Sequence, residues 1–480
     1  MSSSSSSTYN PLPSKTSIRV LLLAPGSPDD EIFCWLLLID LDADHKHFPS
    51  SPEPVDIISV VHGTSSDGSE RKFLIPFDVY WDESKPSPPM HPFQRYTALS
   101  YVWGDTENPG YVMLDGEKRP VTRNLHDALK ALRKESEGIC LWVDALCINQ
   151  SDFEEKKVQI GLMGRVYQQA EKVVAYLPQA EADQANILEL VQKIWEARKK
   201  HEERDVEKEG LEIQRGESKG QIGRIPIPAL EPKIVAMASE QDGIARPHAA
   251  QVQELQNRAQ EKAGFLEDFG LPPVDSPLWG SWRRCFASPY FRRIWILQEF
   301  ALGSSLNFCL GSRVVGMEPI MVAYHFVKEY SGVVNAHYLG HSHPGDPEDL
   351  TRLAIAGAQG AEMMFLERVL AGNRGKGELL LEKLRRGRGF EASDPRDKIY
   401  ALLGLAKDGE VFAEHVNYAP EETPAMIFTR FAGLFVERGC VFEILLQAGL
   451  GSSAVGLPSW VPVRPALAIT HQSLLCKTKH

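Results

Sequence analysis

The carboxylate of Glu299 is the first side chain in this sequence with a residue pattern that suggests chemistry. It follows Trp295 by four residues, about one helical turn, so both side chains are predicted on one face of a helix. Apolar surroundings raise the pKa of a carboxyl group, and a perturbed carboxylate can act on a substrate or hold a sugar hydroxyl. The competing interpretation is a surface glutamate paired with Arg292 or Arg293.

Polar residues also follow two apolar runs. Asp144 ends the run ICLWV and is followed closely by Asn149, and the pair Trp103 and Asp105 ends the run YTALSYV. If both runs are parallel strands, these residues meet at the carboxyl edge of the sheet, where ligands bind. The plainer alternative is loop geometry, with the aspartates accepting hydrogen bonds from backbone amides.

Composition excludes several other classes of site. A net charge of −12 argues against nucleic-acid binding, and the chain has neither a G-x-S-x-G elbow nor metal-ligand spacing. We therefore predict no metal and no required cofactor. The seven cysteines form no C-x-x-C pair, and neither a secretory signal nor an apolar run of about 18 residues is present. These features predict a soluble, cytoplasmic protein with reduced thiols and no membrane association.

Apolar periodicity predicts an α/β fold around these residues. Strands alternate with amphipathic helices over about 80 residues, which favours a parallel sheet flanked by helices. Asp115 and Gly116 suit a tight hairpin turn, and Ser151 with Glu154 suits the start of a helix. The predicted elements are strands at 18–23, 96–102, 139–143, 172–177 and 306–310, and helices beginning near 122, 151 and 288.

Four regions follow from the same pattern. Residues 1–16 form a serine-rich tail expected to be disordered, and residues 17–310 form the α/β domain. A charged helical insertion interrupts that domain at 180–275, and 311–480 is a mostly helical C-terminal region.

Several runs, taken in order, resemble the heterokaryon incompatibility (HET) domain of filamentous fungi. They are YTALSYVWGD, NLHDALKAL, LWVDALCINQ with the helix and strand that follow, SPYFRRIWILQEFAL, DPRDKIYALLGLA and LPSWVP. The HET domain is in turn similar to Toll/interleukin receptor (TIR) domains, which have a flavodoxin-like sheet. ALSYVWGD resembles the first TIR strand, and SPYFRRIWILQEFA resembles the TIR segment in which a glutamate follows a tryptophan by four residues and supports NAD cleavage.

The resemblance implies a role in self/non-self recognition and programmed cell death, akin to innate immunity. It implies NAD as a substrate, with Glu299 as the catalytic residue of an NAD glycohydrolase. The residues implied in binding NAD are Ser100, Trp103, Asp105, Asp144, Asn149 and Trp295. Self-association and an incompatibility partner protein are implied as well. The alternative is a non-catalytic signalling module that acts by self-association and partner binding, in which Glu299 is structural.

Overall fold

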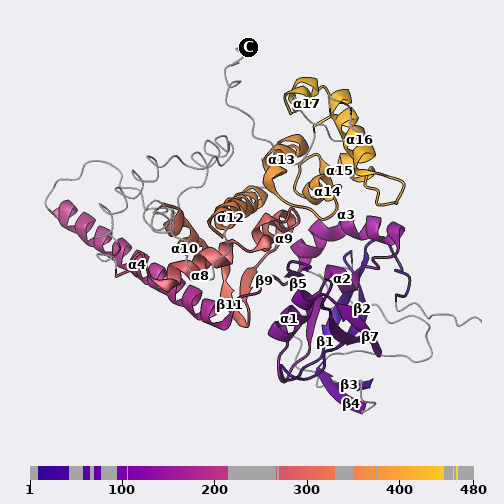
Figure 1. Cartoon of the computed structure of the whole chain (residues 1–480), viewed down its shortest axis with the longest axis horizontal. Coiled ribbons are helices and arrows are strands. Elements are labelled where there is room, and N and C mark those ends of the chain that lie inside the picture. Colours follow the sequence, from indigo (N-terminus) through magenta and orange to yellow (C-terminus); the bar gives the residue numbers. More distant parts are fainter. Residues whose placement is uncertain are drawn as a thin grey trace, which may run out of the picture.

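A computed structural model of the chain describes residues 9–42, 58–64, 70–76, 95–104, 106–214, 266, 270–329, 350–372, 377–447, 458 and 461–462. Asp105, half of the predicted serine-rich tail and most of the predicted insertion lie outside the described residues. The described chain forms one mixed sheet, a separate hairpin and helices that cover the sheet and extend beyond it (Figure 1).

The sheet has nine strands in the order β11-β10-β9-β5-β8-β1-β2-β6-β7. Their bounds are β1 (Ser17–Leu23), β2 (Phe33–Asp40), β5 (Thr97–Ser100), β6 (Gly110–Leu114), β7 (Glu117–Val121), β8 (Ile139–Trp142), β9 (Lys172–Leu177), β10 (Leu306–Leu310) and β11 (Arg313–Gly316). β3 (Ile58–Thr64) and β4 (Glu70–Pro76) pair only with each other. The strands β8, β5, β9 and β10 are parallel, as predicted, but β1 and β11 join them antiparallel.

Short connections explain why the sheet is mixed rather than wholly parallel. Only residues 24–32 separate β1 from β2, which is less than the dozen or so residues that a parallel crossover needs. Gly311, with φ +57°, turns β10 directly into β11. The predicted hairpin turn between β6 and β7 is confirmed, because Asp115 and Gly116 have φ values of +50° and +83°.

Three helices connect the strands. They are α1 (Arg123–Leu132), α2 (Asp144–Cys147) and α3 (Phe153–Gln169). Helices α1 and α3 lie where the periodicity predicts, and the short α2 occupies a segment interpreted from the sequence as a loop. Thr122 caps α1 by accepting a hydrogen bond from the Leu125 amide. The cap of α3 is Asp152, whose side chain accepts from two amides, and not the predicted Ser151.

The predicted insertion begins inside the core. Helix α4 (Glu181–Gln214) follows β9 after three residues and packs against α8 (Pro277–Phe286) and α10 (Met317–Glu329) (Figure 1). Its buried residues recur at i, i+3, i+4 and i+7, namely Ile187, Leu190, Val191 and Ile194. The high charge further along this helix masked its apolar stripe, so residues 181–197 belong to the core rather than to a solvated insertion.

The single helix predicted from residue 288 to residue 302 is instead two short helices. They are the 3₁₀ helix η2 (Pro289–Arg292) and α9 (Ile296–Leu302). Between them, the Ile294 amide donates to the Glu391 carbonyl at 2.9 Å, and the Glu391 amide donates to the Arg292 carbonyl at 2.5 Å. This pairing with a distant segment replaces helical hydrogen bonds, so the chain stays extended at Arg293.

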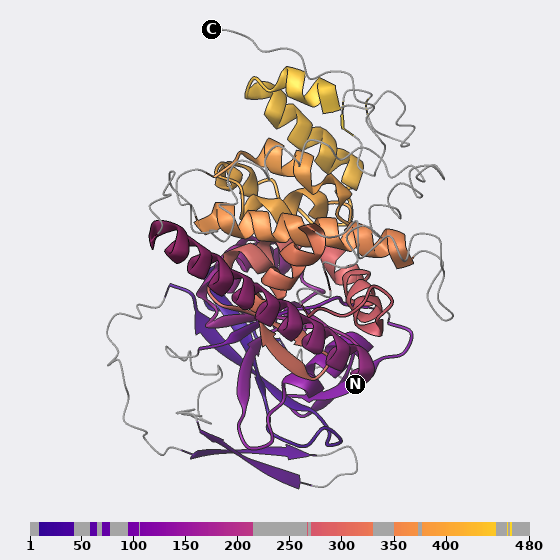
Figure 2. The ribbon, with the colours of Figure 1, turned by 90° about the vertical axis from the view of Figure 1, so that its left-hand side faces the viewer.

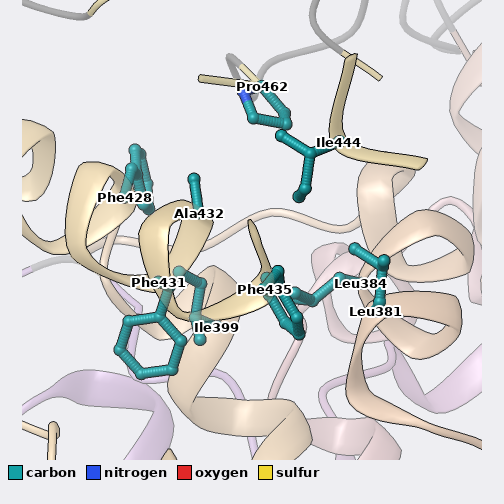
Figure 3. A pocket seen from close by; sticks show the side chains of 9 residues that line it. All are labelled: Leu381, Leu384, Ile399, Phe428, Phe431, Ala432, Phe435, Ile444 and Pro462. Carbon is teal, nitrogen blue, oxygen red and sulfur yellow. The ribbon is translucent and has the colours of Figure 1, made fainter. Parts of the chain in front are cut away.

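The described chain beyond β11 is helical. Its elements after α10 are α12 (Leu350–Gly372), α13 (Leu380–Arg386), η3 (Gly387–Gly389), α14 (Asp397–Leu403), α15 (Gly409–Ala413), α16 (Pro424–Glu437) and α17 (Val441–Gln447). In Figure 2 these orange and yellow helices stand beyond the sheet, but they share one continuous hydrophobic core with it. A small apolar pocket lies among α13, α14, α16 and α17, with Phe431, Phe435 and Ile444 in its lining (Figure 3).

Candidate functional site

Three buried side chains meet where the central strand β5 ends. Ser100, the last residue of β5, donates a short hydrogen bond to Oε2 of Glu299 and shares a 2.8 Å hydrogen bond with the Tyr290 hydroxyl. The exposed fractions are 1% for Ser100, 0% for Tyr290 and 2% for Glu299. The strand, η2 and α9 therefore each contribute one group to a dry polar cluster at the carboxyl edge of the parallel strands.

Burial perturbs the Glu299 carboxyl group strongly. Its pKa is raised from 4.5 to about 7, chiefly by desolvation, and the negative charge of Asp144 acts in the same direction. The charge of Arg293 and the Ser100 hydrogen bond partly oppose that rise. A carboxyl group with a pKa near 7 can both accept and release a proton at neutral pH, which is what acid–base catalysis requires.

A second polar pair lies at the end of the neighbouring strand β8. The Trp103 indole N–H donates to Oδ2 of Asp144 at 2.7 Å, and Oδ1 accepts from the Ala145 amide at 2.7 Å. Burial still raises the pKa of Asp144, against the lowering effects of Arg293 and these hydrogen bonds. The Trp103 side chain is 40% exposed, so an aromatic ring lies at the surface with its polar edge held by a carboxylate.

Arg293 links the two carboxyl groups electrostatically. Its guanidinium donates to the Tyr101 carbonyl, and its charge lowers the pKa of both Glu299 and Asp144. Both carboxylates in turn raise the pKa of Arg293. Two acidic groups thus share one half-buried cation, an arrangement that keeps them close without full mutual repulsion.

The loop after β5 depends on Gly104. Its φ of +75° is disfavoured for any residue with a Cβ, and an added Cβ would lie 3.1 Å from the Asn124 amide nitrogen. The same Asn124 amide donates to the Val102 carbonyl at 3.1 Å. Helix α1 therefore fixes the turn that presents Trp103.

Three residues implied in NAD binding do not lie in this cluster. The Trp295 side chain lies near the carboxylate of Asp397 in the C-terminal region and lowers its pKa, although its position one turn before Glu299 suggested a shared face. The Asn149 side chain accepts hydrogen bonds from Ser151 in the loop before α3. Asp105 lies outside the described residues. Of the residues predicted from the sequence, the cluster thus contains Ser100, Trp103, Asp144 and Glu299.

The site is closed around Glu299. Its carboxylate is 2% exposed, whereas Asp144 and Arg293 are half-buried and Trp103 is the most exposed member. Contact with Glu299 therefore requires one of these side chains to move.

Tyr290, Tyr101 and Arg293 are members of the cluster that sequence reasoning did not propose as functional. Arg293 entered only as the partner of a surface Glu299, yet the glutamate is buried, and Arg292 instead pairs with Glu391 at 3.0 Å. The sequence signal that could have revealed these residues is the presence of polar groups inside a largely apolar segment, PYFRRIWILQEF. A buried polar network requires such groups.

The described residues provide neither a metal site nor a membrane span. No group of three His, Cys, Asp or Glu side chains there could hold a metal ion. None of the helices in that part of the chain combines the length and the apolar character needed to cross a bilayer.

Comparison with known proteins identifies the region that carries the cluster. Residues 96–299 match the family described as heterokaryon incompatibility protein (HET), and this range ends at Glu299 itself. Heterokaryon incompatibility protein 6, OR allele, of Neurospora crassa is 25% identical over 404 residues, which cover 78% of this chain and 54% of that relative. The chain thus spans about half the length of the relative. No solved structure matches the chain at a significant level.

Proposed function

Because the chain carries a heterokaryon incompatibility (HET) domain, we propose that it is a fungal incompatibility protein that acts in self/non-self recognition and programmed cell death. The name of the Neurospora crassa relative supports this role. We further propose that the domain has a TIR-like core and hydrolyses NAD in the cytoplasm, with Glu299 as its catalytic residue.

The observation that supports catalysis is the hydrogen bond from Ser100 to a buried Glu299 whose pKa is raised to about 7. Buried carboxyl groups with perturbed pKa values cluster at active sites more often than elsewhere. Glu299 also lies at the carboxyl edge of four parallel strands, next to the end of β5. That edge is where α/β proteins bind their ligands.

The proposed reaction needs one carboxylate and water. The bond between ribose C1′ and the nicotinamide nitrogen breaks, and its electron pair leaves with nicotinamide, which departs neutral. An ionised Glu299 stabilises the developing positive charge on the ribose and positions its hydroxyls. Water then bonds to C1′ and gives a proton to Glu299, which releases it to solvent. The products are ADP-ribose, nicotinamide and one proton.

The remaining members of the cluster have separate roles in this proposal. The exposed ring of Trp103 stacks on a planar part of the substrate, and Asp144 holds the indole in place. Arg293 keeps part of the Glu299 population ionised at neutral pH, because its charge opposes the effect of burial. Ser100 orients the carboxylate through its hydrogen bond.

Nicotinamide release by purified, concentrated protein tests the enzymatic proposal. We expect wild-type protein to release nicotinamide from NAD and Glu299→Gln to lose this activity at least about a hundredfold, since Gln can neither ionise nor accept the proton. The exposed Glu135→Gln is the matched control and should retain full activity. Equal release by wild type and Glu299→Gln would exclude Glu299 as the catalytic residue.

The non-catalytic alternative is favoured by one observation on helix α17. Phe442 is 79% exposed and Leu446 71% exposed, while Ile444 on the same helix is buried. Exposed apolar residues of this kind are typical of surfaces that bind protein. Under this alternative the chain signals by self-association through α17, and Glu299 only stabilises the fold.

Toxicity on overexpression in a fungal host distinguishes the two proposals. A non-catalytic module predicts that Glu299→Gln remains toxic and that Phe442→Ser with Leu446→Ser abolishes both toxicity and self-association, measured by light scattering. The catalytic proposal predicts that Glu299→Gln alone abolishes toxicity. Expression of every variant at the wild-type level is the control.

A further inference from the structure

Helix α9, which carries Glu299, is held at both ends by the C-terminal region. Before its start, the backbone of Glu391 pairs with Arg292 and Ile294 through two hydrogen bonds. At its end, the guanidinium of Arg368 in α12 donates to the carbonyls of Phe300 at 2.8 Å and of Gly303 at 2.7 Å. Each end of the helix thus depends on residues far away in the sequence.

Asp397, the first residue of α14, lies near the start of α9. Its carboxylate accepts from the Tyr418 hydroxyl at 2.5 Å, and it lies near the Trp295 side chain, whose polar interaction lowers the pKa of Asp397. Trp295 is the N-cap residue of α9, and its carbonyl accepts from the Glu299 amide at 3.2 Å. Only Trp295 therefore separates Asp397 from the backbone that carries Glu299.

Tyr418, which donates its hydroxyl to Asp397, also contacts helix α3. The ammonium of Lys156 on α3 lies 4.7 Å from the ring centroid of Tyr418. The guanidinium of Arg396, the N-cap residue of α14, lies 5.1 Å from the same centroid. Arg396 is fixed in turn by Asp394, at 2.7 Å. Such a connected network of buried and charge-assisted bonds holds its members in one arrangement.

We propose that Asp397 is a positioning residue for the Glu299 site, and that the C-terminal region acts as a clamp on α9. By restraining the Trp295 side chain, Asp397 fixes the start of α9 and the extended residue Arg293 just before it, whose guanidinium acts on Glu299. The clamp is argued from contacts alone, but its effect on turnover rests on the proposed NAD hydrolysis.

A helix of seven residues explains why the clamp matters. Isolated helices shorter than about 12–15 residues are marginal in water, so α9 takes its stability from the elements packed around it. Displacement of a reacting group by about 1 Å is enough to lower a rate about a hundredfold. Loss of the Asp397 contact should therefore affect the site even where the core remains folded.

Hydrogen exchange of the full-length protein tests the clamp without reference to activity. Trp295→Phe and Asp397→Asn should each speed amide exchange in residues 296–302 about tenfold, the effect expected from losing one polar interaction with a charged group. Exchange in α1 should not change. The matched control is Trp279→Phe, which removes an indole donor from a buried tryptophan in α8 and should leave α9 protected.

The pH profile of nicotinamide release distinguishes a positioning role from simple destabilisation, because lower stability alone does not shift the pH at which activity changes. Glu299 faces Ser100 from β5, Asp144 from α2, Tyr167 from α3, and Tyr290 and Arg293 from its own segment. If the clamp variants let Arg293 move away, the limb of the profile set by Glu299 should shift to higher pH, with lower kcat.

Wild-type protection of α9 in both clamp variants would overturn the proposal. So would a loss of activity with an unshifted pH limb, because that loss would reflect only less folded protein. Wild-type protein that releases no nicotinamide would refute the proposed function, and hydrogen exchange would still decide the clamp.

Discussion

Replacing Glu299 with Gln should stabilise the folded protein, and the gain should grow with pH. The pKa of Glu299 is about 7 in the folded protein and 4.5 for an unperturbed glutamate. Between these values the folded state binds a proton that the unfolded state has released, so the free energy of unfolding falls as pH rises. Below 4.5 the group is neutral in both states and costs nothing. Gln resembles the protonated form and avoids the cost at every pH.

The size of the effect follows from the two pKa values. The full difference corresponds to about 3 kcal/mol, reached above pH 7. At pH 5 the cost is about 0.8 kcal/mol, because the unfolded glutamate is already largely ionised. We therefore expect Glu299→Gln to gain about 2.5 kcal/mol more at pH 8 than at pH 5.

Urea unfolding of wild type and Glu299→Gln at pH 5 and pH 8, followed by tryptophan fluorescence, measures this double difference. The exposed Glu135→Gln is the control and should change the free energy of unfolding by less than about 0.5 kcal/mol at either pH. Equal effects of Glu299→Gln at the two pH values would refute the reasoning, because a group ionised in both states carries no pH-dependent cost.

Three further predictions concern the site and its support. If ionised Glu299 is the active form, nicotinamide release should rise with pH through about 7, and a rate that is flat from pH 6 to pH 8 would contradict this role. Gly104→Ala should destabilise the protein by about 1–2 kcal/mol in urea unfolding, because φ is +75° and Asn124 crowds the new methyl group. Gly116→Ala is the control, because Gly116 also has a positive φ but has open space around it. A larger loss of stability at Gly116 than at Gly104 would contradict the crowding argument. Glu155→Ala should lower the free energy of unfolding by about 3–5 kcal/mol, because it leaves the Arg19 side chain, which is 2% exposed, without the carboxylate that lies 2.6 Å away. A loss below about 1 kcal/mol would mean that water reaches this arginine.

Local pattern predicted the parallel centre of the fold well. The strands β5, β8, β9 and β10 lie where their apolar runs indicated, and the Asp115-Gly116 turn follows from backbone sterics that act within two residues. The antiparallel strands were harder, because sequence periodicity does not report strand direction. The apolar stripe in the first half of α4 is hard to recognise in the sequence because charged residues interrupt it, among them Asp183, which pairs with Arg284 of α8.

For the candidate site, types and spacing identified Glu299, Trp103 and Asp144 but not their relations. The hydrogen bond between Ser100 and Glu299 joins residues 199 positions apart, and that from Trp103 to Asp144 joins residues 41 apart. The break at Arg293 depends on Glu391, about a hundred residues downstream. Neither spacing nor propensity within a window of one helix contains that information.

The sequence by itself determined where the parallel strands lie, where the polar residues follow them, and which family the central region resembles, because these depend on neighbouring residues. Only the tertiary structure decided that Glu299 is buried beside Ser100 and Arg293, and that Trp295 turns toward Asp397. The physical reason is that desolvation and charge act through space, so the pKa of a carboxyl group depends on what the whole chain packs around it.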